Sequence, residues 1–418
     1  MASRYLLHPP FPVFNVLRTA RHFSLLAGVK NPIPATFIRG GTSKGIFLNR
    51  AHLPTDQSQW DAIFLGIMGS PDAQYGRQLN GMGGGVSSLS KICVVGSPSE
   101  AQKAAGVDVE YTFAQVGIRD SILDYSGNCG NLSSMIGVFA VDEGMCIPRI
   151  SHPAASGPTL TGSVRTFNTN TNKRIDNTFL VAQAKSGSHY VPVLDGEQAS
   201  IAGVPGRAAP IFLDFVSPSG ARTGQLLPSG RPLDTIHIPL SRDPSRSVAL
   251  PVSLVDATNP TVFTSDRALR AALGIPDPAT IDYAERGVVD ALERVRQAGA
   301  RLMGLDPLAQ AQPKIAVLSP APADDAEADI VINAFSMGVL HRAVPMTVGL
   351  CLGVAARVPH TLAWDALGDR RSDSGDLVRI RHPGGVVEVG AELDGGGEVT
   401  SARVMRTGRR LMKGAVWW

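Results

Sequence analysis

A cysteine between two glycines is the residue of this sequence that is best placed for chemistry. Cys129 lies in segment 126–131, Ser-Gly-Asn-Cys-Gly-Asn, which precedes apolar residues at helical spacing. At a helix N-terminus the positive end of the helix dipole favours a thiolate, and the same backbone N–H groups can bind a carboxylate. Cys93 and Cys351 stand within apolar runs, so we interpret them as packing residues. The pattern predicts a functional role for Cys129.

A lysine after a serine-rich turn could provide a base. Lys91 ends the sequence Ser-Ser-Leu-Ser-Lys at 87–91 and precedes an apolar run at 92–95. A lysine facing solvent there would be unremarkable, and that alternative stays open. If the side chain faces a cleft instead, the loss of water favours the neutral amine, which is the basic form.

Two glycine-rich segments could bind anionic oxygens. Residues 40–45 read Gly-Gly-Thr-Ser-Lys-Gly, so bare backbone N–H groups stand beside two hydroxyls, and residues 81–85 read Gly-Met-Gly-Gly-Gly. The first segment lacks the spacing of a P-loop, which disfavours nucleotide phosphate. A tight β-turn between two short strands explains residues 40–45 equally well.

The order strand, turn, helix and hairpin occurs twice along the chain. In the first half we expect strands at 34–39, 46–48, 92–95, 109–116, 164–170 and 177–183, and a helix after residue 131. In the second half we expect strands within 252–263 and at 330–332, a helix at 341–356 and a hairpin at 378–389. Asn128 or Asn131 is expected to cap the first of these helices. An amphipathic surface helix is expected at 282–301, and the acidic loop 324–329 is expected to be solvated.

Composition and length fit a globular protein with two domains. The chain has 418 residues, of which 44% are hydrophobic and 18% charged, and its 44 glycines and 30 prolines suit short strands with tight turns. The net charge of +3 comes without the basic stripe of a nucleic-acid binder, and no apolar run reaches the length of a membrane span. The four cysteines lack the spacing of a zinc site, so no metal is expected.

The first 33 residues have the composition of an organelle transit peptide. No acidic residue precedes Asp56, and residues 13–21 would place apolar and basic side chains on opposite sides of a short helix. This favours a mitochondrial protein, with a disordered extension of a cytoplasmic protein as the alternative. Residues 1–33 are therefore left out of the fold prediction.

Taken together, these segments resemble the PrpF family. That family comprises 2-methylaconitate cis–trans isomerases, with 3-methylitaconate isomerases and fungal aconitate delta-isomerases as relatives. The resemblance runs in one order from about residue 34 to the end of the chain. Beyond the segments already named, it rests on residues 226–230, 256–260, 336–338, 341–343 and 406–412.

The resemblance implies a diaminopimelate-epimerase-like α+β fold. Two pseudo-symmetric domains, 34–235 and 236–418, would each be a curled β-sheet around a central helix, and the last strand is free to return to the first domain. The site would lie between the domains. True epimerases carry a cysteine at the N-terminus of both central helices, whereas the second position here reads Ser-Met-Gly at 336–338. Two-cysteine racemisation is therefore disfavoured.

The implied activity is cofactor-independent isomerisation of an unsaturated tricarboxylate such as aconitate or 2-methylaconitate. Lys91 would take an allylic proton, with Cys129 as proton partner or carboxylate anchor, and no metal or redox cofactor is required. The residues expected to bind substrate are Thr42, Ser43, Gly83, Gly84, Gly130, Ser336, Met337, His341 and Arg342. For Arg342, a structural role at the helix start stays open beside that of a carboxylate clamp.

Two other functions remain open on the same scaffold. One is a cofactor-independent epimerase or racemase, and the other is a non-catalytic carboxylate-binding protein that assists a dehydratase. The expected partner is a small di- or tricarboxylate, not a nucleic acid or a membrane; a homodimer is one assembly that the resemblance allows. Because one methyl group is worth only about 1–3 kcal/mol, the sequence does not choose among cis-aconitate, 2-methylaconitate and methylitaconate, or between the methylcitrate cycle and an itaconate pathway.

Overall fold

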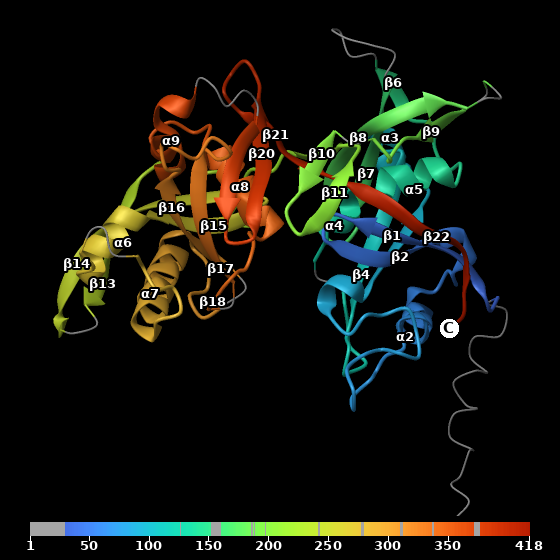
Figure 1. Cartoon of the computed structure of the whole chain (residues 1–418), viewed down its shortest axis with the longest axis horizontal. Helices are drawn as coiled ribbons and strands as arrows, with labels where there is room; N and C mark the ends of the chain where they lie inside the picture. The colour runs from blue at the N-terminus through green and yellow to red at the C-terminus, as the bar shows by residue number, and fades with distance from the viewer. Residues whose placement is uncertain are drawn as a thin grey trace, which may run out of the picture.

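The chain forms two lobes that lie side by side (Figure 1). The computed structural model describes residues 30–125, 127–151, 160–184, 187, 189–196, 198–240, 243–276, 280–309, 312–336, 338–371 and 377–418. The transit peptide expected at 1–33 thus falls almost wholly outside the described residues. In the described part of the chain, no helix is both long and apolar enough to cross a membrane.

The first lobe is a curled sheet around a central helical segment. Its main strands are β1 (Ile33–Gly40), β2 (Ser43–Asn49), β3 (Lys91–Gly96), β4 (Val109–Val116), β7 (Leu160–Asn168), β8 (Lys173–Gln183) and β12 (Ile211–Val216). Shorter strands are β5 (Leu123–Asp124), β6 (Arg149–Ser151), β9 (Tyr190–Pro192), β10 (Ala199–Ile201) and β11 (Val204–Ala208). Helices α4 (Gly130–Ser133) and α5 (Ile136–Asp142) pack inside the curl, α2 (Trp60–Met68) packs outside it, and α3 (Glu100–Ala104) links β3 to β4.

Successive apolar side chains along the strands point to opposite faces of this sheet and build a hydrophobic core on each. Phe47 and Cys93 are register partners in the parallel pair β2–β3, and both are buried against the central helical segment. Their neighbours Ile46 and Ile92 point the other way and are buried with α2. Because successive side chains of a strand point to opposite faces, near-continuous apolar runs are what a sheet covered on both sides requires.

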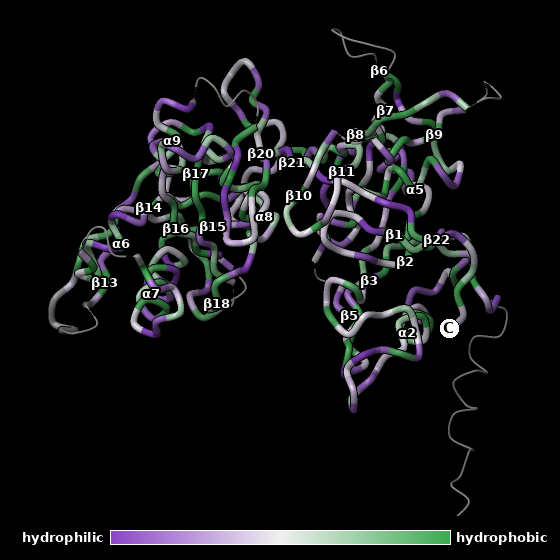
Figure 2. The backbone as a smooth tube through the Cα atoms, in the orientation of Figure 1, coloured by the Kyte–Doolittle hydropathy of each residue, from purple (hydrophilic) through white to green (hydrophobic). Residues whose placement is uncertain are grey.

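The second lobe repeats this arrangement. Its strands are β13 (Asp234–Leu240), β14 (Asp243–Ala257), β15 (Asn259–Ser265), β16 (Lys314–Pro320), β17 (Ile330–Ser336), β18 (Val339–Leu340), β19 (Leu377–His382), β20 (Gly385–Leu393) and β21 (Val399–Arg406). Helix α8 (Met346–Ala355) lies inside the curl, α6 (Asp266–Leu273) and α7 (Arg286–Leu302) lie outside it, and α9 (Leu362–Leu367) follows α8. Ala316 and Leu318 face α8, whereas Ile315 and Val317 face the outer helices. Figure 2 shows the hydrophobic stretches within both lobes.

The last two strands tie the lobes together. Strand β21 pairs with β20 of the second lobe and also, over residues 401–406, with β12 of the first lobe. The chain then crosses to the first lobe, where β22 (Gly408–Val416) pairs with β1 (Figure 1). Residues 406–408 therefore lie where the two lobes meet.

The expected fold class is confirmed, with local corrections. The helix expected at 341–356 begins only at Met346, because Pro345 disfavours helical geometry in the residue before it and is itself extended. The helix expected after residue 131 is two short helices, and neither Asn128 nor Asn131 caps it: Cys129 holds the N-cap position without a side-chain bond. The boundary expected between residues 235 and 236 falls inside β13.

Candidate active site between the lobes

A cleft of about 1160 Å³ opens between the two lobes. The first lobe contributes Thr42, Ser43, Ser87, Ser88, Lys91, Phe113, Gln115, Asp124, Gly127, Asn128, Cys129, Gly130 and Asn131, with Ser200, Ile201 and Ala202 from β10 and the turn after it. The second lobe contributes, among others, His341, Met346, Arg379, Arg381, His382, Met405 and Arg406. This volume is ample for a small organic acid.

Lys91 reaches this cleft from the first residue of β3. Its side chain is 9% exposed, and Nζ donates to Oε1 of Gln115, its register partner on β4, at 2.5 Å. The Nε2 of Gln115 donates in turn to the carbonyls of Ser87 and Ser90, at 3.1 and 2.9 Å. Because those two bonds fix the amide, its oxygen faces the amine. Nζ also lies 5.1 Å from the ring centroid of Phe113, so an aromatic face covers the amine on one side.

Cys129 reaches the same cleft from the N-terminus of α4. Its Sγ lies 3.7 Å from Oγ of Ser43 and is partly buried. Asn128 does not cap the helix because its side chain bonds to Tyr111 and Ser133. The thiol therefore stands beside the free N–H groups of the first helical turn.

Cys93 lies between these two side chains and has a packing role, as expected. Burial raises the pKa of its thiol well above the usual value; the neighbouring Cys129 adds to this rise and Lys91 opposes it. In the second lobe, burial likewise raises the pKa of the Cys351 thiol, to about 12. Both cysteines are fully buried in the two central cores.

The glycine segment 40–45 forms a tight hairpin turn between β1 and β2. Gly40 pairs with Ser43, and Gly41 has a φ of +52°, which other residues adopt only with strain. A Cβ at Gly41 would stand 2.2 Å from Oδ1 of Asn131. The glycines let helix α4 approach the turn, where Nδ2 of Asn131 donates to Oγ1 of Thr42 at 3.0 Å. The β-turn interpretation of this segment is confirmed.

The two central helices meet at the cleft. Gly130 opens α4 and Met346 opens α8, and a Cβ at Gly130 would stand 2.1 Å from Sδ of Met346. The N-termini of the two helices therefore lie close together, with the side chain of Met346 packed against Gly130. The positive ends of two helix dipoles favour an anion there.

Several residues expected to bind substrate lie outside the lining of the cleft. Neither Gly83 nor Gly84 lines the cleft, and the N–H of Gly83 already donates to the carbonyl of Met68 at 3.2 Å. Arg342 is exposed and precedes α8 by four residues, which also rules out a role at the helix start. The expected residues that do line the cleft are Thr42, Ser43, Lys91, Cys129, Gly130 and His341. The side chains of Ser336 and Met337 lie outside the described residues.

Two histidines of the second lobe line the cleft, and in both of them the ring nitrogen Nδ1 accepts a hydrogen bond. Nδ1 of His341 accepts the N–H of Ala343, and Nδ1 of His382 accepts the N–H of Gly384, both at 3.1 Å. Burial, then the charge of Arg406 and then that of His341, lowers the pKa of His382 to about 4. At neutral pH His382 is therefore uncharged and presents Nε2–H as a donor.

Arg406 is a cleft residue that the sequence did not single out. It ends β21, where it continues the row of Ala402 and Val404 that faces the core around α8. Its Nε donates to Oδ1 of Asn131 at 3.1 Å, and Nη1 donates to the carbonyl of Met405 at 2.8 Å. No motif in segment 406–412 marks Arg406 as functional, because its position in the cleft depends on how the chain crosses between the lobes.

The acidic loop 324–329, expected to be solvated, is so only in part: Asp324 and Glu327 are exposed, whereas Asp329 is buried. Asp325 forms an ion pair with Arg381, and Asp329, which is 1% exposed, forms one with Arg379 at 2.7 Å. Hydrogen bonds from Arg381 lower the pKa of Asp325 to about 2. Both arginines line the cleft, and the carboxylates of the loop balance their positive charge.

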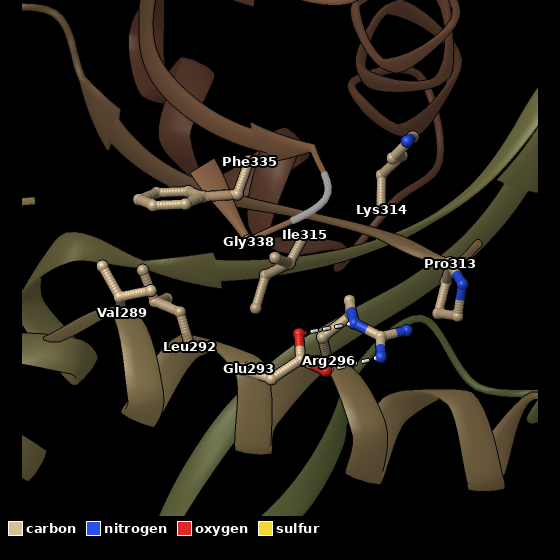
Figure 3. Close-up of a pocket in the computed structure, with 9 residues that line it drawn as sticks. All are labelled: Val289, Leu292, Glu293, Arg296, Pro313, Lys314, Ile315, Phe335 and Gly338. Carbon is tan, nitrogen blue, oxygen red and sulfur yellow. Dashed lines mark hydrogen bonds and ion pairs between the residues drawn. The ribbon is translucent and has the colours of Figure 1, made fainter. Parts of the chain in front are cut away.

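A second, far smaller cavity lies under α7 (Figure 3). Its volume is about 10 Å³, room for one water molecule at most. Arg296 there donates to Glu293 and to the carbonyls of Pro307 and Ala309, so its polar groups are already satisfied. Across the described residues, no three His, Cys, Asp or Glu side chains are grouped to hold a metal ion.

Comparison with known proteins gives the class of protein to which this two-lobed scaffold and its cleft belong. The chain is 34% identical to the 3-methylitaconate isomerase of Eubacterium barkeri, over 92% of this chain and 97% of that protein. It is 32% identical to the 2-methyl-aconitate isomerase of Cupriavidus necator, over 92% and 96%. The crystal structure of a methylitaconate-delta-isomerase superposes with a TM-score of 0.76 at 32% identity, covering 93% of this chain and 96% of that one.

The chain belongs to the PrpF family: the family model described as PrpF protein matches residues 30–418. The named relatives are isomerases, and this chain is an isomerase as well. The family and the activity class expected from the sequence are confirmed, and an epimerase, a racemase or a non-catalytic accessory protein is not favoured.

Proposed function

We propose that the protein isomerises unsaturated tricarboxylates of the aconitate or 2-methylaconitate type by moving a proton at an allylic carbon. The observation that carries this proposal is that Lys91 and Cys129 line one cleft, next to two helix N-termini. The relatives' names, which refer to methylitaconate and methyl-aconitate, support the substrate class.

Lys91 acts as the base in this proposal. The C–H bond next to a carboxylate breaks, the proton moves to Nζ, and the electron pair spreads over the allyl unit into the carboxylates. Return of a proton to the far end of the allyl unit shifts the double bond; its return to the first carbon after rotation interconverts cis and trans. The hydrogen-bond partner of Nζ is the neutral amide oxygen of Gln115, which positions the amine in the cleft.

Cys129 returns the proton or anchors a carboxylate. Its thiol and the hydroxyl of Ser43, 3.7 Å apart, stand at the opening of α4. Fixed N–H groups aimed at a carboxylate stabilise the charge that develops there in the transition state, and they do so without reorganisation. The charge of the intermediate is carried by the substrate and these donors, so the proposed reaction needs no metal or redox cofactor.

Proton NMR in D₂O tests the activity directly. The purified protein is mixed with cis-aconitate, trans-aconitate or 2-methylaconitate, and the vinyl signals are followed. We expect interconversion or deuterium incorporation with at least one of the three. Silence with all of them, from protein that is folded by circular dichroism, would contradict the proposal and favour a binding role.

Variants assign the two residues. Lys91→Met should abolish turnover, whereas Lys44→Met, which removes a lysine stacked 5.8 Å from the ring centroid of Phe37 outside the cleft, should not. Cys129→Ser should slow the reaction less, or impair one direction of proton transfer. Near-normal turnover in Lys91→Met would end the assignment of the base, and full activity in Cys129→Ser would leave the thiol as an anchor or a spectator.

A mitochondrial location, within the methylcitrate cycle or an itaconate pathway, completes the proposal. Its support is the acid-free, arginine-bearing composition of residues 1–33. Fusing these residues to a fluorescent protein tests it: import into mitochondria is expected, and a diffuse cytoplasmic signal would contradict it. A homodimer stays part of the proposal, and light scattering of the purified protein measures it.

A further inference from the structure

The cationic side chains of the cleft differ in what balances their charge. Lys91, Arg379, Arg381 and Arg406 line it within the described part of the chain. Arg379 and Arg381 are paired with Asp329 and Asp325. Arg406 lies within reach of no carboxylate among the described residues and contacts only neutral oxygens. Its charge is therefore available to an anion that enters the cleft.

The hydrogen bonds of Arg406 fix its orientation and leave donors free. A guanidinium has five N–H groups. The Nε–H is held by Asn131 and one Nη1–H by the carbonyl of Met405, so three N–H groups of this cleft-lining residue remain without a described protein partner. Asn131 is itself held by Thr42, so the first lobe aims a guanidinium that the second lobe supplies. Such a planar fork matches a carboxylate in bidentate fashion.

Burial makes an unpaired cation costly in the empty cleft. The Arg406 residue is 9% exposed, and this burial lowers the pKa of its guanidinium to about 10, an effect that the neighbouring Cys129 opposes. The group is still positive at neutral pH. A buried charge without a counter-charge destabilises the fold, and an arriving carboxylate removes that penalty.

We infer that Arg406, oriented by Asn131, binds one carboxylate of the substrate and holds it across the junction of the two lobes. The inference rests on the proposed function, because it names the group that recognises the substrate of that same site. His382, which is uncharged and close to Arg406, adds a neutral donor beside the clamp.

Binding of carboxylates that cannot be isomerised tests the clamp apart from catalysis. The probes are propane-1,2,3-tricarboxylate and glutarate, the same chain without the central carboxylate, and calorimetry gives Kd for each. Arg406→Met should weaken tricarboxylate binding about 100-fold and Arg406→Lys about 10-fold. Arg409→Met removes an exposed arginine three residues further along the same crossing and should leave Kd within about twofold of the wild type.

The pair of probes also identifies the carboxylate. An equal loss for both probes in Arg406→Met supports a clamp on a terminal carboxylate that they share. A loss confined to the tricarboxylate supports a clamp on the central one. Unchanged Kd values for both probes would overturn the inference, even if the variant had lost turnover.

A second variant gives Arg406 an internal partner. Asn131→Asp has the shape of the original and places a carboxylate where Nε of Arg406 now finds an amide oxygen at 3.1 Å. If the charge of Arg406 is balanced only when a carboxylate binds, the new aspartate should raise the melting temperature of the protein measured without added carboxylate. It should also weaken tricarboxylate binding by at least about 10-fold. Wild-type affinity in this folded variant would count against the clamp. Turnover of aconitate by the wild type is read separately, so failure of the clamp and failure of the proposed reaction are told apart.

Discussion

Acid should weaken the fold through a single imidazole of the cleft. His382 ends β19, is 7% exposed and lies near the positive charge of Arg406. Its pKa is lowered to about 4 in the folded protein, against about 6.5 in an unfolded chain. Between these values the unfolded chain binds a proton that the folded chain excludes, so stability falls as the pH falls. The contribution of His382 is fully present above pH 6.5 and is lost on acidification towards pH 4.

The size of the effect follows from the lowered pKa. Each pKa unit is worth about 1.4 kcal/mol, so the fall from 6.5 to about 4 sets an upper bound of about 3 kcal/mol. Because the cleft is open to solvent, about half of this is expected, roughly 1–2 kcal/mol. His382→Asn keeps an acceptor for the N–H of Gly384 and carries no proton in this range.

Urea denaturation at pH 7.0, 6.0, 5.0 and 4.5 measures the effect in the wild type and in the variant. The stability of the wild type should fall by about 1–2 kcal/mol more than that of His382→Asn over this interval. His237→Asn, which replaces an exposed imidazole on β13, serves as the matched control. Parallel curves for the wild type and His382→Asn would refute the reasoning.

Three further substitutions test the supports of the site and of the fold. Gln115→Leu removes the acceptor that positions Lys91, so kcat should fall about 10- to 100-fold with KM nearly unchanged; a matching rise in KM would point to substrate binding instead. Gly41→Ala would place a Cβ 2.2 Å from Oδ1 of Asn131 at a residue whose φ is +52°, so the free energy of unfolding measured in urea should fall by about 2–4 kcal/mol. A fall below about 0.5 kcal/mol would show that the turn relaxes freely. Arg296→Met, on the buried face of α7 and outside the lining of the cleft, should lower the free energy of unfolding by about 3–5 kcal/mol without changing kcat per folded molecule; a changed kcat would contradict that separation.

Sequence patterns identified those parts of the fold that depend on local signals. The strand expected at 109–116 is β4, residue for residue, because alternating apolar residues between turn signals define it without help from the rest of the chain. The hairpin at 40–45 is equally local. The start of α8 was misplaced although Pro345 was visible, because the apolar periodicity was continued through it to His341.

The site was predictable where the chemistry was concentrated in one segment. Lys91 and Cys129, far apart in the sequence, line the same cleft because two parallel strands and a helix N-terminus bring them there. Gly83 also lies in a glycine-rich segment, like Gly41, but its N–H donates to the carbonyl of Met68 at the end of α2. Arg406 could not be found in this way, since its role comes from β21 pairing with both lobes.

The place of β22 has a consequence for synthesis on the ribosome. Strand β1 starts at Ile33, yet the strand that covers its second edge ends at Val416, close to the last residue of the chain. Until β22 is synthesised, the first lobe therefore carries an open strand edge, to which another nascent chain could add. Closure of that edge follows directly on the synthesis of Arg406, so a chain that lacks β22 would expose an aggregation-prone edge on the first lobe.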